Sequence, residues 1–210
     1  MARPKSFSYT PQDDSLTGFA ENVTGASFTL AATTPNDDLA HLVIVTNDSA
    51  TDHSAKTLAL VGTDADGKAQ TETMAAPGSS TTSTSSKYWK TLTSVTPSAT
   101  IGGDTFDIGW TDDAISKTIP IDFHQNSMQV ALAVDVSGTI SYTLQHTFQE
   151  IQNASVVPST LTWYNHDVLA SLTADNSSAL AVPVTAIRIL LNSLTSGATI
   201  KLYVIQSTAG

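Results

Sequence analysis

Cysteine is absent from the 210-residue sequence, which therefore has neither a disulfide framework nor a thiolate metal site. A chain without cysteine fits folding in a reducing cytoplasm. Positive charge is also scarce, with 9 Lys and Arg against 19 Asp and Glu and a formal net charge of −10. Because no basic run gathers on one segment and the overall field repels phosphate, we expect no direct contact with nucleic acid.

Long apolar runs are missing too. None approaches the ~20 residues that span a bilayer, and the opening stretch MARPKSFSY lacks the apolar region of a secretory signal, so we expect a soluble chain without a leader and no membrane partner. Charged residues make up only 13% of the sequence, about half the usual share. Neutral polar residues must cover the surface, which suits a β-protein that packs into a large assembly, because fixed charges would be desolvated at each contact.

Motifs for catalysis and for cofactors do not occur. No serine lies in Gly-x-Ser-x-Gly, no Walker lysine follows a glycine-rich loop, and no Gly-x-Gly-x-x-Gly opens a helix. The five histidines never stand two or four residues apart, as in a local metal-binding pair; they are His41, His53, His124, His146 and His166. We predict no catalytic residue, no cofactor and no metal site, and a protein that is not an enzyme.

Strand patterns fill most of the chain. Leu39–Thr46 is a β-branched run typical of a buried strand, and His41 within it is expected to be a core histidine. Asp66-Gly67, a dipeptide that tolerates the positive φ angles of a type I′ turn, predicts a hairpin within Lys56–Met74. A turn explains this stretch better than a calcium loop, because the position where such a loop carries glutamate is Ala75.

The strongest pattern lies in the second half of the sequence. Apolar and polar residues alternate along Val130–Phe148 on both sides of Ser137-Gly138, which predicts a hairpin with one buried face and one polar face. His146 falls on the apolar face and is expected to be a hydrogen-bonded core histidine. Two more strands flank Ser196-Gly197, and no stretch has the pattern of a long amphipathic helix.

These patterns predict an all-β protein made of two antiparallel β-sandwich units in tandem, each jelly-roll-like or immunoglobulin-like. The predicted divisions are an N-terminal arm or lead-in over residues 1–36, a first unit over 37–112, a connector over 113–127 and a second unit over 128–210. The connector is placed where two acidic residues and a proline interrupt the strand pattern.

A run of eight serines and threonines within Ser79–Pro97 directly precedes Lys-Tyr-Trp-Lys. It lies inside the first predicted unit rather than between units, and threonine is a good strand residue. We predict a loop beside a strand, or an edge strand, that presents hydroxyls outward while Tyr88 or Trp89 packs inward.

One side-chain cluster could recognise a ligand. Trp163, Tyr164 and His166 follow one another around Asn165 and before Asp167. Aromatic rings beside amide and carboxylate groups are typical of a sugar-binding face or a wet protein interface. The alternative is a loop in which the tryptophan packs into the core and the Asn-His-Asp sequence forms a turn.

Two parts of the chain resemble uncharacterised virion structural proteins of tailed bacteriophages. The run LVGTDADGKAQTETMAAPGSSTTSTSSKYWKTLTSVTP resembles a segment common in that group. The stretches VSGTISYTLQHTF, TWYNHD and VPVTAIRILLNSLTSGATIKLYVIQS resemble its closing part. Together these matches cover most of Leu58–Trp110 and Val130–Gln206, and no catalytic signature accompanies them.

The resemblance implies a component of the phage particle, made in the cytoplasm of a bacterial host. The leading hypothesis is a capsid decoration or cement protein that binds and stabilises the lattice of the major capsid protein, with strand addition at sheet edges and Phe7, Tyr9 and Phe19 as a tether or interface. A neck, tail or head-spike component that binds other virion proteins is the alternative. We expect a homo-oligomer, for which a trimer is one option.

A carbohydrate-binding module is the alternative from another class. It rests on the cluster Trp163, Tyr164 and His166 alone.

Overall fold

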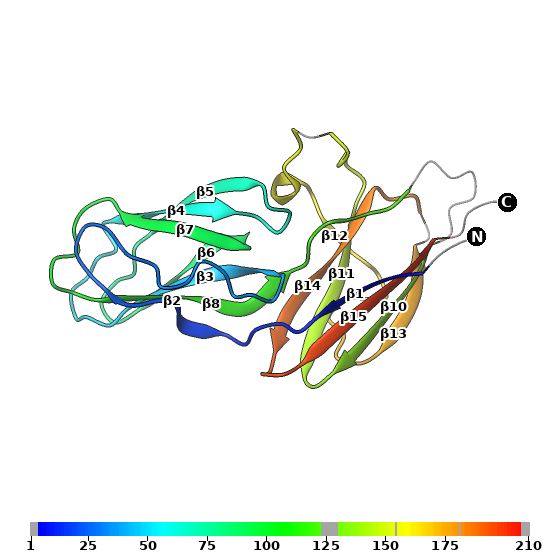
Figure 1. The fold of residues 1–210 in the computed structure, drawn as a ribbon, viewed down its shortest axis with the longest axis horizontal. Helices are drawn as coiled ribbons and strands as arrows, with labels where there is room; N and C mark the ends of the chain where they lie inside the picture. The colour runs from blue at the N-terminus through cyan, green and yellow to red at the C-terminus, as the bar shows by residue number, and fades with distance from the viewer. Residues whose placement is uncertain (1–3, 123–129, 154, 181, 207–210) are drawn as a thin grey trace. The chain divides into compact units, whose positions relative to one another are not determined.

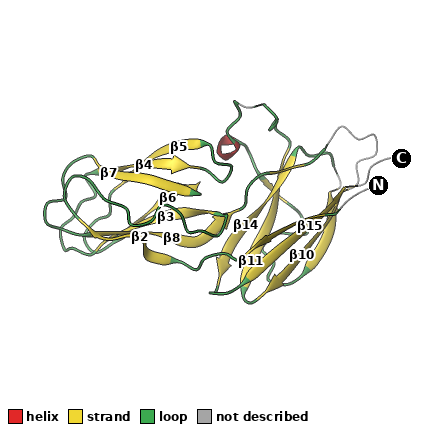
Figure 2. Ribbon diagram, in the orientation of Figure 1, coloured by secondary structure: helices red, strands yellow, loops and turns green. Residues whose placement is uncertain are grey.

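The computed structural model describes residues 4–122, 130–153, 155–180 and 182–206. Within these ranges the chain is built of strands and loops, with a single 3-10 turn, η1 (Pro158–Thr160), as its helical element (Figure 2). The predicted all-β, antiparallel fold class is therefore confirmed. No helix in these ranges has the length and apolar character needed to cross a membrane.

The chain forms two compact units that are not consecutive in sequence. The inserted unit, as we name it, is Asp13–Ala114, and the split unit combines Met1–Gln12 with Ile115–Gly210 (Figure 1). A simple tandem of units, with residues 1–36 as one arm, does not describe this arrangement. The predicted arm is divided, because its first strand pairs within the split unit and its second within the inserted unit.

The inserted unit contains two sheets. In the first, the strand order is β2–β8–β3–β6, and in the second it is β5–β4–β7, with antiparallel pairing of β4 to both neighbours. The first sheet consists of β2 (Ser15–Val23), β8 (Phe106–Ile115), β3 (Ala40–Asn47) and β6 (Thr82–Trp89). The second consists of β5 (Ala69–Ala75), β4 (Thr57–Thr63) and β7 (Thr91–Pro97).

Residues from both sheets share the core of the inserted unit, a β-sandwich-like arrangement. Leu58 and Leu60 of β4 are fully buried, whereas the alternating Ala59 and Val61 are exposed, as the two-residue period of a strand requires. Phe19 is 0% exposed. This burial contradicts its predicted role as a tether, because the ring is not available to a partner.

Trp110 is the partner of Phe19 in this core. The two rings meet edge to face with centroids 5.0 Å apart, and the indole Nε1 of Trp110 donates to the Asp13 carbonyl at 3.0 Å. Gly18 makes the approach feasible, since a Cβ at this position would lie 2.2 Å from the Trp110 ring. The position of the Trp110 ring therefore requires glycine at residue 18 of β2.

Residues 82–86 of the Ser/Thr run lie in the edge strand β6, as predicted, but Ser85 is buried and its hydroxyl accepts from the Val43 N–H instead of pointing outward. β6 ends the order of its sheet, and Trp89 is 0% exposed. The Glu72 carboxylate of β5 accepts hydrogen bonds from the backbone N–H groups of Ser86 and Lys87, at 2.7 and 3.1 Å. These bonds tie the edge of one sheet to the other and occupy backbone donors that would otherwise face outward.

His41 is a core histidine, as predicted. Its Nδ1–H donates to the Thr111 carbonyl at 2.8 Å, and its Nε2 lies 2.7 Å from Oδ2 of Asp37. Both side chains of the His41–Asp37 pair are fully buried. Because a carbonyl only accepts, Nδ1 must carry a proton, so the Nε2 contact to the carboxyl group is also a hydrogen bond with one proton between the two atoms.

The split unit also contains two sheets. One has the strand order β1–β15–β10–β13; in the other, β11 lies between β12 and β14, and β9 pairs with β14. The first consists of β1 (Lys5–Tyr9), β15 (Thr199–Gln206), β10 (Val130–Ser137) and β13 (Asn176–Leu180). The second consists of β12 (Tyr164–Asn165), β11 (Ile140–Thr147), β14 (Ala186–Leu194) and β9 (Ile119–Pro120).

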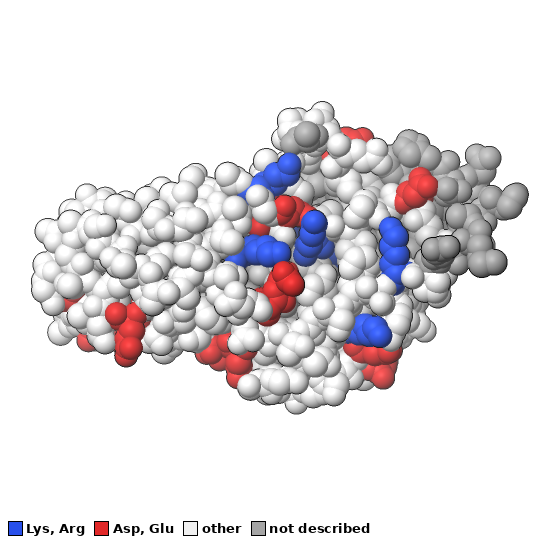
Figure 3. All heavy atoms as spheres, in the orientation of Figure 1, with Lys and Arg blue, Asp and Glu red and all other residues white. Residues whose placement is uncertain are grey.

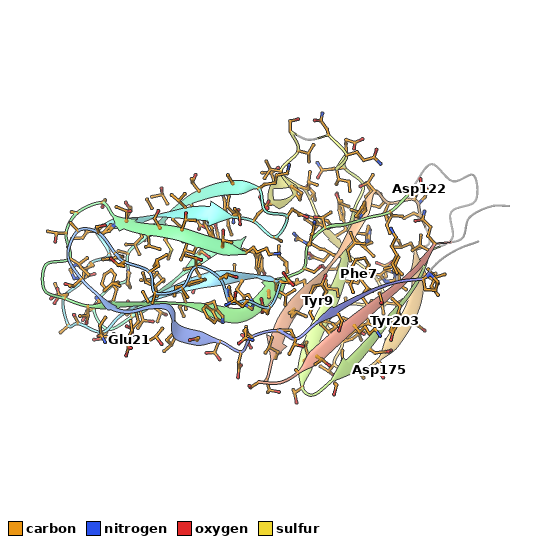
Figure 4. The ribbon with its side chains drawn as sticks, in the orientation of Figure 1. Phe7, Tyr9, Glu21, Asp122, Asp175 and Tyr203 are labelled. Carbon is orange, nitrogen blue, oxygen red and sulfur yellow. The ribbon has the colours of Figure 1, made fainter. Side chains whose placement is uncertain are left out.

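Phe7 and Tyr9 belong to the fold rather than to a free arm. In the β1–β15 ladder they lie opposite Leu202 and Ile200, which are buried, and both aromatic side chains are half-buried (Figure 4). Opposed residues in an antiparallel pair point to the same face, so the two rings cover the buried side of β15. A tether made of these residues would require β1 to leave its sheet.

The predicted connector, 113–127, is partly structured. β8 continues to Ile115, three residues beyond the predicted end of the first unit, and β9 pairs Ile119 with Ile187 of β14. A pair of aspartates does not end a strand when the flanking residues are buried, as Ala114 and Ile115 are. Residues 123–127 of the connector lie outside the described ranges.

The turns at Ser137-Gly138 and Ser196-Gly197 do not form hairpins, contrary to the prediction for Val130–Phe148. Each joins strands of different sheets: β10 to β11 in one case and β14 to β15 in the other. The two crossings pack together, since a Cβ on Gly138 would lie 3.0 Å from Cα of Ala198. Burial alternates along β10, but Thr143, Gln145 and Thr147 of β11 are also buried, so the predicted polar face is absent from that strand. Alternation is also the same for a hairpin and for a turn that crosses between sheets.

A substitution at Gly109 of β8 tests the close packing of the inserted unit. A Cβ there would lie 1.7 Å from the Ser15 carbonyl oxygen, so Gly109→Ala must displace β2 and should lower the free energy of unfolding by about 3 kcal/mol. Gly103→Ala is the matched control, because nothing lies within 4 Å of its Cβ position, and it should change stability by less than about 0.5 kcal/mol. Urea denaturation measures the free energy of unfolding of both variants. Equal values for the two would contradict the close approach of β2 to Gly109.

Tyr142 of β11 gives a pH-dependent prediction. Burial, with a further contribution from the charge of Asp175, raises its pKa from 10.0 to about 12. The folded state therefore keeps a proton that the unfolded state loses, and stability should fall as the pH rises from about 10 to about 12. Tyr142→Phe should remove this component of the alkaline loss, at the cost of about 1 kcal/mol for the hydrogen bond to the Ala174 carbonyl. Denaturation midpoints of the two proteins across this range are the measurement.

Candidate functional site

A hollow of about 450 Å³ opens on the split unit. It lies where the segment containing β12 passes the end of β11 and the edge strand β13. We name it the aromatic hollow; its lining is His146, Phe148, Tyr164, Asn165, His166, Asp167, Val168, Ser178, Ala179, Leu180 and Val182. The sequence cluster that included Tyr164 and His166 is thus part of a concave surface, the usual shape of a site for a small ligand.

Exposed apolar side chains concentrate at this hollow. Of the seven large hydrophobic side chains that are exposed in the described residues, four line it. Their exposed fractions are 49% for Phe148, 50% for Tyr164, 52% for Val168 and 48% for Val182. Exposed apolar groups that gather in one place, rather than lie scattered, indicate a binding surface.

Three rings form one wall of the hollow. Tyr164 lies nearly parallel to His146, with an interplanar angle of 29° and centroids 6.1 Å apart. Phe148 meets the His146 ring edge to face at 5.2 Å and lies 5.7 Å from the Tyr164 ring. The register of β11 and β12, which places His146 opposite Tyr164, produces this contact.

His166 supports the hollow through its hydrogen bonds. It is 7% exposed, its Nδ1 accepts from the backbone N–H groups of Val168 and Leu169 at 3.1 and 3.3 Å, and its Nε2–H donates to the Ala179 carbonyl at 3.2 Å. Because two N–H donors point at Nδ1, this nitrogen is the acceptor and Nε2 carries the proton that is donated to Ala179. The histidine therefore joins the turn after β12 to β13 and has no free nitrogen for acid–base chemistry.

His146 has a different environment from the one predicted. It is half-buried, and its Nδ1 is buried without a hydrogen-bond partner, so it is not the hydrogen-bonded core histidine that the alternation indicated. Burial lowers its pKa, nearby His166 lowers it further, and the charge of Asp167 opposes the shift. The protein thus favours a neutral His146 ring in the wall of the hollow.

Trp163 lies apart from the other members of its cluster. It does not line the hollow; its ring lies 4.2 Å from the guanidinium carbon of Arg188, and its Nε1 donates to the Pro158 carbonyl at 3.2 Å. Arg188 in turn donates to Oε1 of Gln145 at 2.8 Å, and Gln145 donates to Oδ1 of Asn165 at 2.9 Å. Trp163 precedes β12, and its contacts with Arg188 and Pro158 hold it away from the ring of Tyr164.

The charges at the hollow favour neutral ligands. No lysine or arginine is among its lining residues, and Asp167, which is exposed, is its one carboxylate. A phosphate or carboxylate group would therefore meet no cation there. Across the described ranges, no group of three or more His, Cys, Asp and Glu side chains has an arrangement that could hold a metal ion.

A histidine–aspartate pair in the inserted unit is structural. His53 lies 2.9 Å from Asp104 through Nε2, and its Nδ1 lies 2.8 Å from Nζ of Lys56, which also donates to the Thr100 carbonyl at 2.7 Å. Since a lysine ammonium only donates, Nδ1 must accept, and both ring nitrogens are engaged. The ring also packs edge to face on Phe106. Its contacts stabilise a loop and leave no nitrogen to activate a nucleophile.

The sequence identified only part of the hollow. Phe148 was visible as the last residue of an alternating run, but its exposure depends on the end of β11 at Thr147. β13 was missed altogether, because its sequence NSSAL has no strand pattern and it is ordered by pairing with β10. Tertiary contacts therefore assemble the site from segments that carry no local signal.

None of the protein-family models, curated proteins and solved structures that were compared with the chain matches it.

His146→Phe tests the cost of the unpartnered nitrogen. The lowered pKa of His146 means that the unfolded state takes up a proton first, so the wild-type protein should lose stability as the pH falls below about 6.5. Phenylalanine keeps a ring in the wall and removes both the buried Nδ1 and the titration. We expect the variant to be at least as stable at pH 7 and to lose less stability between pH 7 and pH 5, in thermal unfolding of both proteins. A parallel acid-side loss in both would contradict the assignment.

Proposed function

We propose that the protein is a structural component of a tailed-bacteriophage particle, and specifically a capsid decoration protein that binds the major capsid lattice. Support for the phage assignment comes from the sequence resemblance over Leu58–Trp110 and Val130–Gln206. Support for a structural role comes from an all-β chain with few charges. Such a protein acts by burying surface against neighbouring subunits rather than by chemistry.

The observation that carries the docking role is an uncharged face on the inserted unit. The outward-pointing residues of β4, with those that oppose them on β5 and β7, include no charged side chain. We name this set the uncharged face; it consists of Thr57, Ala59, Val61, Thr71, Thr73, Ala75, Ser94 and Thr96. Figure 3 shows large areas without charged side chains over this unit.

The energetics of this face suit contact with another protein. Val61 is 41% exposed and is flanked in register by Thr71 and Ser94, so apolar area lies among hydroxyls that can form hydrogen bonds across an interface. No side chain of the face carries a charge that must be desolvated, although the ammonium of Lys87 donates to the Thr71 carbonyl at 2.7 Å. The chain carries a net charge of −10, yet its carboxylates lie elsewhere than on this face.

A glycan-binding role is the second candidate, and the aromatic hollow favours it. Two half-exposed aromatic rings beside a carboxylate and a hydroxyl group are typical of a sugar-binding site. The two roles use different surfaces and are compatible in one protein, because the uncharged face belongs to the inserted unit and the hollow to the split unit.

Cryo-EM of the phage that encodes the protein tests the proposed function. The difference density between wild-type particles and particles made without the protein should repeat over the capsid shell. Val61→Asp places a charge at the centre of the uncharged face and should lower occupancy on the shell about tenfold, since an uncompensated charge in an interface costs more than 1.4 kcal/mol.

Leu16→Asp is the matched control, because Leu16 is 48% exposed on β2 of the same unit and lies outside the uncharged face. It should leave occupancy unchanged. Difference density at one vertex or along the tail would replace the decoration role by the neck, tail or spike alternative. Absence of the protein from purified particles would overturn the phage proposal.

A further inference from the structure

We infer that the aromatic hollow of the split unit binds a neutral sugar residue, with the faces of Tyr164 and Phe148 as the stacking surface and Asp167 and Ser178 as the polar contacts. The inference specifies the ligand class of the glycan-binding role proposed above. It rests on the proposed function only for the setting of a phage particle. Three properties of the hollow select this ligand class: its charge, its rings and its polar groups.

The charge of the hollow excludes anionic ligands. Its lining contains no lysine or arginine, both nitrogens of His166 are engaged with the backbone, and Asp167 adds negative charge. Nucleotides, phosphorylated peptides and acidic sugars would each bring a negative group to a site without a counterion. A neutral ligand avoids this cost.

The rings favour a ligand with a flat face of C–H groups. Tyr164 and Phe148 are each about half exposed while both remain in contact with His146, so their positions are held without being covered. A purely apolar ligand would need deeper burial than an open hollow offers. A pyranose ring needs only one apolar face covered and leaves its hydroxyls for polar partners.

The polar groups are fixed before a ligand arrives. Gln145 donates to the Asn165 amide oxygen at 2.9 Å on the side of β12 away from Tyr164, and this bond holds the backbone of β12 beside β11. Asp167 follows His166, whose ring fixes the turn by accepting two backbone N–H groups. Preorganised groups lower the entropy that binding costs, so a small ligand is sufficient to occupy them.

An extended peptide is a poorer fit than a sugar. Strand addition beside the hollow would use the free edge of β13, but the His166 ring already donates to the Ala179 carbonyl at that edge. A peptide strand would have to displace this bond and release the buried histidine. A ligand in the hollow is therefore bound by side chains and not by strand pairing with the backbone of β13.

Saturation-transfer NMR and chemical-shift titration of the full chain with methyl glycosides of glucose, galactose and N-acetylglucosamine test the inference. We expect at least one glycoside to shift the amide signals of the hollow residues. Tyr164→Ala should weaken that binding about tenfold, because a stacked aromatic contributes on the order of 1 kcal/mol or more. Tyr164 is 50% exposed, so its removal should leave the fold intact, which a thermal melt verifies.

Tyr203→Ala is the matched control. Tyr203 is a half-exposed tyrosine of β15 in the same unit, lies outside the lining of the hollow and packs against Lys201 (Figure 4). The Tyr203→Ala variant should bind the glycoside with the affinity of the wild-type protein. The inference fails if no glycoside shifts the hollow residues, if Tyr164→Ala binds unchanged, or if inorganic phosphate or tetramethylammonium binds there in place of the sugars. None of these results alters the position of the protein on phage particles, so the two proposals fail separately.

Discussion

The pairing of β1 with β15 is the constraint on which the rest of the architecture depends. It joins Lys5–Tyr9 to the strand that ends at Gln206 and so makes the split unit from both ends of the chain. The chain leaves this unit after Gln12, builds the inserted unit and returns at Ile115. Joining strands almost two hundred residues apart costs loop-closure entropy, which the contacts of the folded units must offset.

Sheet-crossing turns give the split unit its two faces and its hollow. The tight connections at Gly138 and Gly197 transfer the chain from one sheet to the other, so β10 pairs with β15 and β13 while β11 pairs with β14 and β12. β12 and β13 consequently lie at the ends of their sheets. Neither is covered by a further strand among the described residues, and the aromatic hollow occupies that place.

Both surfaces proposed for binding have few charges, but they are built differently. The uncharged face is regular: alternation places Thr, Ser, Ala and Val on one side of three paired strands. The aromatic hollow is irregular, and its position depends on the hydrogen bonds of one buried histidine. The regular surface suits repeated contacts in a lattice, whereas the irregular one suits a discrete ligand.

The sequence by itself determined the class of fold, the positions of most strands and several local features. Period-two alternation buried Leu132 and Val134, the Asp66-Gly67 turn formed a hairpin, and the Ser/Thr run became an edge strand with Trp89 inside. These features follow from short-range geometry, which a sequence pattern records directly.

Only the tertiary structure decided which strands pair, how the chain divides into units and which members of the Trp163–Asp167 cluster share a surface. The sequence of a tight turn does not reveal whether the turn joins neighbouring strands of one sheet or crosses between sheets. The sequence around an aromatic residue near the N-terminus likewise does not reveal whether that residue lies in a free arm or in a paired strand. Partner choice depends on long-range burial, so Phe19 became core, Phe7 became part of β1, and Trp163 separated from Tyr164.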